Sequence, residues 1–132
     1  MTQSTFSPKG VVSIKAGGTV GQYEPVKLNS TQEEVVVTTG TTDLVYGVSL
    51  IDGVDGDMVS IARSGSVLMR CGSGGVTLGN LVGIDSSDKT EIAAITESGT
   101  GTTLHDIIGQ AEQTGASNAL VVVGLRIGRT LI

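Results

Sequence analysis

The feature that most constrains this chain is an internal repeat at two fixed offsets. Residues 20–28 match residues 76–84 in the placement of their apolar side chains, at an offset of 56. Residues 58–62 match residues 120–124 at an offset of 62, and a longer loop around residues 97–103 absorbs the difference. Because neither half is large enough to bury a core alone, the repeat predicts two similar halves packed together.

Turn signals divide the chain into short segments. Patches rich in Val and Ile alternate with turn residues such as Gly-Gly, Asn-Ser and Asp-Gly, and helical periodicity is scarce. This pattern predicts an all-β fold, a small β-barrel or sandwich of short strands. We expect at most one short helix, near residues 44–50 or 103–110. The expected strands are residues 11–15, 26–28, 34–38, 44–51, 58–62, 66–71, 81–85, 91–95, 104–110 and 119–127.

Gly47 and Gly109 occupy equivalent places in the repeat, in Tyr46-Gly47-Val48 and Ile108-Gly109-Gln110. A glycine inside a strand marks a bulge or a close backbone approach. The chain has 132 residues, which suits one domain. We therefore expect a flexible N-terminal arm over residues 1–10 and a single β domain over residues 11–132, duplicated over about 17–65 and 74–128.

The charge distribution argues against nucleic acid as a partner. The net charge is −5 and the pI is about 4.6, whereas a nucleic-acid-binding domain carries a basic surface. Lys9, Lys15, Arg126 and Arg129 lie toward the two ends, and every acid lies between Lys15 and Arg126. Two interpretations remain open: a solvated acidic surface, or basic ends that dock on an acidic neighbour.

The remaining composition concerns the cellular compartment. Cys71 is the single cysteine, so no internal disulfide can form, and we expect it to fill a small apolar space in the core. Residues 1–9 lack the apolar stretch of a signal peptide, and no run approaches transmembrane length. We expect the protein to be soluble and intracellular when made.

Few side chains could support catalysis or bind a metal. His105 is the only histidine, which leaves no multi-histidine metal site. The acidic segment 52–57 resembles part of a calcium loop, but the twelfth position counted from Asp52 is Arg63 rather than glutamate. An Asp-Gly turn is the alternative. The glycine clusters complete no phosphate-binding motif. We therefore expect no enzymatic activity, catalytic residue, metal or cofactor.

Several short phrases in the sequence resemble a known family. They are Glu24-Pro25-Val26, Tyr46-Gly47-Val48, the segments 56–61 and 65–67, and Gly79-Asn80-Leu81-Val82-Gly83. Over about residues 10–127 this pattern is similar to the capsid decoration (cement, or head-stabilising) proteins of tailed bacteriophages. Members of that family are often labelled as uncharacterised phage proteins or recombinases. Asn80 departs from the family pattern, which has an acid there, and the loop before Leu104 is longer.

The resemblance implies a structural protein on the outer surface of the capsid in the virion, made in the host cytoplasm. Such proteins are β-barrel-like, form homotrimers at local three-fold positions, and bind the major capsid protein against internal DNA pressure. The implied partners are the major capsid protein and other copies of this chain, without nucleic acid or membrane. The candidate contacts with the capsid or a neighbour are Phe6, Pro8, Lys9, Arg126 and Arg129.

Three alternatives stay open beside this interpretation. The N-terminal arm either orders on the capsid or is a frayed terminus. A virion- or cell-surface module could recognise a glycan or host ligand through the Thr/Ser/Gly-rich loop 96–103, although three aromatic residues give few stacking surfaces for sugars. An enzyme such as a recombinase would need a nucleotide-binding loop, which the sequence lacks.

Overall fold

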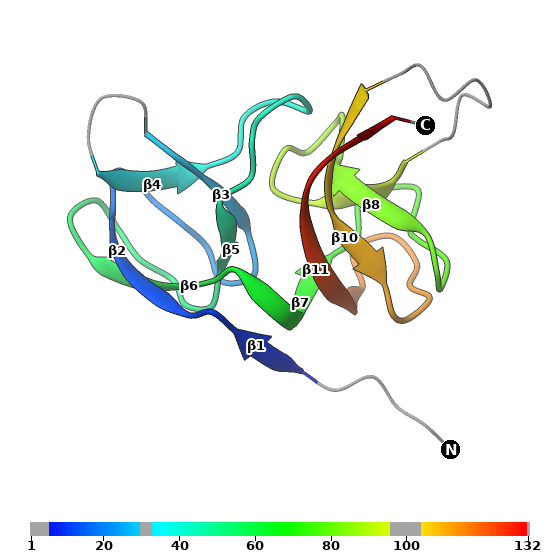
Figure 1. Ribbon diagram of the computed structural model, residues 1–132, viewed down its shortest axis with the longest axis horizontal. Coiled ribbons are helices and arrows are strands. Elements are labelled where there is room, and N and C mark those ends of the chain that lie inside the picture. The colour runs from blue at the N-terminus through cyan, green and yellow to red at the C-terminus, as the bar shows by residue number, and fades with distance from the viewer. Residues whose placement is uncertain (1–5, 30–32, 96–103, 132) are drawn as a thin grey trace.

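The computed structural model describes residues 6–29, 33–95 and 104–131. Figure 1 shows them as two groups of short strands side by side. The described residues form eleven strands and no helix, so no described helix could cross a membrane. The predicted all-β fold, a small barrel or sandwich built from two similar halves, is confirmed. Where a short helix was allowed, the chain forms β5 (Gly47–Ser49) and β10 (Leu104–Ala111).

The first group of strands closes into a five-stranded barrel. It contains β5 together with β2 (Val12–Ala16), β3 (Pro25–Leu28), β4 (Glu34–Val37) and β6 (Met58–Ala62), in the order β2-β4-β3-β5-β6. Neighbours run antiparallel except β2 and β4, whose parallel pairing covers only Lys15 with Glu34 and Ala16 with Val35. Valine-rich strands with alternate side chains facing inward suit the narrow interior.

The second group is a six-stranded sheet. It contains β10 together with β1 (Ser7–Lys9), β7 (Ser64–Arg70), β8 (Leu81–Ile84), β9 (Ile92–Ala94) and β11 (Leu120–Leu131), in the order β1-β7-β11-β10-β8-β9. A parallel bridge between Cys71 and Ile92 links the end of β7 to β9. This bridge corresponds to the Ala16–Val35 pair of the barrel. Strands β7 to β11 therefore repeat the connectivity of β2 to β6.

Backbone hydrogen bonds recur at the offsets of the sequence repeat. Val20 and Gly53 each donate an N–H to the other's carbonyl, both at 2.9 Å. Val76 and Gly115 do the same in the second half, at 2.9 and 3.0 Å. Each pair joins the segment before the second strand of its half to the turn before the last strand of that half. The equivalent pairs therefore hold the same two segments together in each half.

The repeated glycines lie where two backbones approach closely. A Cβ added at Gly47 would collide with the carbonyl oxygen of Ala62, and one added at Gly109 would collide with that of Gly124. The pairing of β10 with β11 also shifts register between Ile107 and Gly109, which is the bulge expected from an interior glycine. Both positions therefore require a residue without a side chain.

The two halves share an apolar core. A smaller cluster lies inside the barrel, whereas the larger cluster joins Val45, Val48 and Ala62 of the first half to buried side chains of the second. Cys71 lies in this larger cluster, where burial raises the pKa of its thiol. Thr38 Oγ1 donates a hydrogen bond of 2.6 Å to the carbonyl of Lys89, which also links the halves. The halves therefore pack as one unit.

The expectation of a flexible arm over residues 1–10 is wrong for residues 7–9. Residues 7–9 form β1, which pairs antiparallel with Ser64–Ser66 of β7, and residues 1–5 lie outside the described residues. Pro8 lacks an N–H to donate, but it is tolerated because β1 is an edge strand. Partner backbone groups on β7, rather than apolar alternation in β1, determine this strand.

Candidate binding surfaces

The acidic segment forms a turn before β6, and we call residues 51–57 the acidic loop. The Oδ2 atom of Asp57 accepts the N–H of Val54 at 2.9 Å, and the Oδ1 atom of Asp52 accepts the N–H of Gln22 at 2.7 Å. Gly56 has a φ of 92°, as a turn of this kind requires. No group of three or more potential metal ligands occurs among the described residues.

The single histidine lies in β10. The Cα atoms of His105 and Thr130 are partners in the ladder between β10 and β11, and those of Asp106 and Arg129 follow them. His105 therefore lies within the ladder that joins β10 to β11.

Three of the five predicted contacts lie together at the open edge of the sheet. Pro8 and Lys9 are in β1, and Phe6 directly precedes it. The Phe6 side chain is 45% exposed, and its ring packs edge-to-face on Tyr23 with the centroids 6.0 Å apart. This end of the chain is therefore attached to the body of the protein, with an aromatic side chain still accessible.

The two predicted arginines lie elsewhere in the sheet. Arg126 is an exposed residue of β11, and Arg129 is nearer the end of that strand. β7 lies between β1 and β11 in the strand order. The structure thus brings Phe6, Pro8 and Lys9 together but places the arginines two strands away.

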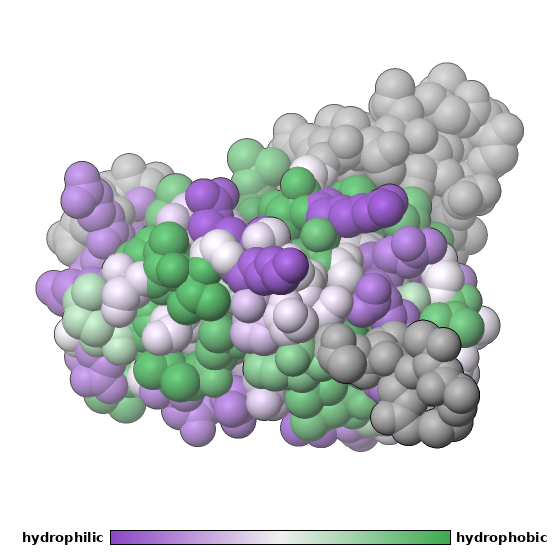
Figure 2. All heavy atoms as spheres, turned by 60° about the horizontal axis from the view of Figure 1, so that its bottom comes forward, coloured by the Kyte–Doolittle hydropathy of each residue, from purple (hydrophilic) through white to green (hydrophobic). Residues whose placement is uncertain are grey.

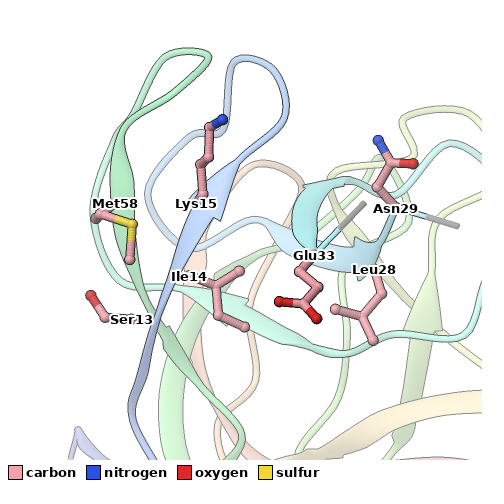
Figure 3. A pocket seen from close by; sticks show the side chains of 7 residues that line it. All are labelled: Ser13, Ile14, Lys15, Leu28, Asn29, Glu33 and Met58. Carbon is pink, nitrogen blue, oxygen red and sulfur yellow. The ribbon is translucent and has the colours of Figure 1, made fainter. Parts of the chain in front are cut away.

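A hollow of about 450 Å³ lies beside β2 on the barrel. It is lined by Ser13, Ile14, Lys15, Leu28, Asn29, Glu33 and Met58, and Figure 3 shows the Glu33 side chain between Ile14 and Leu28. The hollow exists because β4 pairs with only the last part of β2, so the first part of β2 has no neighbour there. Lys15 points away in Figure 3 and forms a 3.3 Å ion pair with Glu34.

A second hollow of about 480 Å³ adjoins the first at Leu28, which lines both, and we call it the Arg63 groove. Its walls are Lys27 and Leu28 of β3, the segment 42–46, and Arg63, which alone separates β6 from β7. The Arg63 guanidinium lies 4.0 Å from the centre of the Tyr46 ring, and its Nε donates to the Tyr46 carbonyl at 3.2 Å. A stacked arginine of this kind keeps its outer N–H groups available to a partner.

Asp43 fixes the loop that forms one wall of the Arg63 groove. Its Oδ2 atom accepts the N–H groups of Thr39 and Gly40 at 2.8 and 3.0 Å and lies 3.0 Å from the Nζ of Lys27. Burial acts to raise the pKa of Asp43, but these hydrogen bonds and the lysine charge outweigh it and lower the pKa. Asp43 is therefore held as a carboxylate.

A smaller polar hollow of about 220 Å³ lies where the halves meet. Burial, and then the nearby carboxylates of Asp88 and Asp85, raise the pKa of Glu91 in its wall. Hydrogen bonds from Thr90 lower the pKa of Asp88. Arg70 Nη1 donates to the Asn118 carbonyl at 2.7 Å on the other side. Burial and repulsion from neighbouring carboxylates thus raise the pKa of Glu91, while Arg70 donates to a backbone carbonyl.

Exposed apolar side chains gather on the barrel half. Figure 2 shows extensive apolar surface over that side of the molecule. The large apolar side chains exposed there are Val11, Leu28, Leu44, Ile51, Val54 and Met58. Sequence patterns did not single out this surface, because its members come from loops and strand ends that only the folded barrel brings together. Exposed apolar side chains concentrated on one half of a small protein favour contact surfaces on that half.

The chain has a fold similar to that of a solved phage protein. No family model and no curated protein matches the sequence. Among solved structures, the chain is similar to the N base of the head fiber gp8.5 of bacteriophage phi29, with a TM-score of 0.62 and 13% sequence identity. The match covers 88% of this chain and 92% of that chain. At this identity the two proteins share a fold over nearly their whole lengths.

Proposed function

We propose that this chain is a structural protein of a bacteriophage head. The observation that carries the proposal is the shared fold, because the matched protein is part of a phage head fiber and the match spans most of both chains. A fold by itself does not assign a function. The sequence phrases that resemble phage capsid decoration proteins support the same role from a separate source.

Within that role we propose that the chain decorates the outside of the head as a homotrimer. Placed at local three-fold positions, a trimer would contact several copies of the major capsid protein at once, so weak individual contacts would add as avidity. Such cross-links would resist the pressure of packaged DNA. The role is non-enzymatic, and the acidic loop suits it because Asp52 and Asp57 accept backbone N–H groups.

Phe6, Pro8 and Lys9 at the sheet edge, with Arg126 and Arg129 on β11, are the proposed contacts with the capsid. The accessible aromatic ring of Phe6 and the exposed Lys9 and Arg126 support this assignment. The basic residues Lys9, Arg126 and Arg129 on a protein of net charge −5 would favour an acidic capsid surface.

Phage heads that lack this protein provide the test. Purified chain should co-sediment with the heads and saturate at a fixed ratio, and bound heads should retain their DNA to a higher temperature. A double variant, Lys9→Glu with Arg126→Glu, should bind more weakly. Lys89→Glu is the control, since it reverses a charge away from the proposed contacts.

The outcomes separate the parts of the proposal. A chain that does not bind heads contradicts the head-associated role. Binding with unchanged DNA retention contradicts stabilisation against internal pressure. Equal binding by the double variant and the unchanged chain contradicts the assignment of the contact residues.

A further inference from the structure

The barrel carries two surfaces of opposite charge, one at each end of β6. The acidic loop precedes Met58, the first residue of β6, and Arg63 follows Ala62, the last. In Figure 1 the loop lies at the left end of the barrel, whereas β7 begins near the centre of the molecule. At about 3.3 Å per residue, β6 holds the two surfaces about 17 Å apart. They cannot meet within one chain.

The Arg63 groove combines a cation with exposed apolar side chains. Leu44 is 62% exposed and Leu28 is 52% exposed on its walls. The described ion pairs join Lys15 to Glu34 and Lys27 to Asp43, so Arg63 has no carboxylate partner in the part of the chain that the structure describes. The groove would therefore accept a segment that carries both a carboxylate and an apolar side chain.

The acidic loop is such a segment. Val54 is 59% exposed at its tip, and Asp52, Asp55 and Asp57 are exposed around it. Asp52 and Asp57 each accept one backbone N–H, whereas the described ion pairs include none of the three carboxylates. The loop presents negative charge beside an apolar side chain that fits no space in its own barrel.

The internal repeat shows that the barrel scaffold does not need these groups. At an offset of 62, Arg63 corresponds to Leu125 and Asp55 corresponds to Ser117. Leu125 packs against the apolar core of the second half. The second half therefore builds the same strands and turns without either charge, and both surfaces occur only in the first half.

We propose that the acidic loop of one copy docks in the Arg63 groove of the next copy. Val54 packs against Leu28 and Leu44, and Asp55 pairs with the guanidinium of Arg63. The contact joins different surfaces of identical chains, so it is heterologous and either closes into a ring or grows into a filament. A ring of three copies would form the homotrimer of the proposed function. The inference rests on the self-association of the chain in that function, and not on its binding to the head.

Charge reversal on purified protein tests the contact without phage heads. Arg63→Glu and Asp55→Lys should each weaken self-association roughly tenfold, because an attractive pair becomes a repulsive one. The double variant that carries both changes should regain association, since the pair is restored with opposite polarity. Sedimentation velocity over a range of protein concentrations measures the effect, and added salt should weaken association of the unchanged chain.

Two variants serve as controls. Ser117→Lys adds a lysine at the equivalent turn of the second half, and Lys89→Glu reverses a charge outside both the acidic loop and the Arg63 groove; both should associate like the unchanged chain. Asp55 lies in an exposed loop, so Asp55→Lys remains informative if Arg63→Glu fails to fold. Thermal unfolding of each variant shows which ones are folded.

Three results would overturn the inference. They are a chain that stays monomeric at every concentration, single reversals that associate normally, and a double variant no better than the single ones. Each can occur while the unchanged chain still binds phage heads, so failure of this contact is distinct from failure of the head-associated role. Single reversals that lose head binding but keep self-association would assign the groove to the capsid protein instead.

Discussion

At the scale of single residues, Asp43 links the stability of the barrel to the shape of the Arg63 groove. Its carboxylate holds two backbone N–H groups and the Lys27 ammonium, so the wall of the groove depends on its charge. Without that carboxylate, the segment 42–46 would lose the contacts that place Leu44 and Tyr46 around Arg63.

Asp43→Asn is expected to lower the free energy of unfolding by about 1 kcal/mol at neutral pH. The folded-state pKa of Asp43 lies below its usual value of 3.8. The stabilisation is therefore fully present above that pH and is lost as the pH falls through the folded-state pKa. Urea unfolding at neutral and acidic pH should show the difference closing in acid. Glu33→Gln, at an exposed position, is the control, and a difference that persists in acid would contradict this account.

The structural role of a residue could be predicted from the sequence where the backbone geometry admits only one residue type, and not elsewhere. Gly47 and Gly109 were identified from the sequence because a close backbone approach excludes any side chain. By contrast, Tyr23 adopts a φ of 67° at the position where the second half has Gly79 with a φ of 92°. Nothing local marks a tyrosine for the left-handed region. Its conformation follows from the turn that surrounding hydrogen bonds enforce.

At the scale of elements, ten strands coincide with predicted segments and β1 does not. The ten carry Val and Ile between turn residues, so local pattern and tertiary fold agree. The Ser-Pro-Lys sequence of β1 has no such pattern, and its strand depends on the free edge of β7. The Arg63 groove was unpredictable for the same reason, because its walls meet only after β3, β5 and β6 are in register.

Deleting residues 1–9 should therefore weaken the sheet without unfolding it. Loss of the few hydrogen bonds between β1 and β7 is expected to lower the free energy of unfolding by about 1–3 kcal/mol. Backbone amides of Ser64–Ser66 should exchange with solvent faster, as measured by hydrogen exchange. Deletion of residues 1–5, which leaves β1 intact, is the matched control. Equal stability of the two shortened chains would show that β1 adds nothing to the fold.

At the scale of the whole molecule, the repeat builds two halves, a barrel and a sheet, that do not stand alone. Val48 and Ala62 belong to strands of the first half but lie in the cluster that holds Cys71 and Ile108 of the second. A duplication with a core of its own in each half would leave these positions facing solvent. The shared cluster therefore makes the stability of each half depend on the other.

The protein should unfold in a single transition, and each half carries a probe for it. Both tyrosines, Tyr23 and Tyr46, lie in the first half, and the buried thiol of Cys71 lies in the second. Val48→Ala is expected to cost about 2 kcal/mol through the cavity that it leaves. In urea it should shift tyrosine fluorescence and the thiol labelling of Cys71 together, although it changes only the first half. Val11→Ala, at an exposed site, should shift neither. Tyrosine fluorescence that changes well before Cys71 becomes reactive would mean that the barrel opens alone, and the shared core would then not couple the two halves.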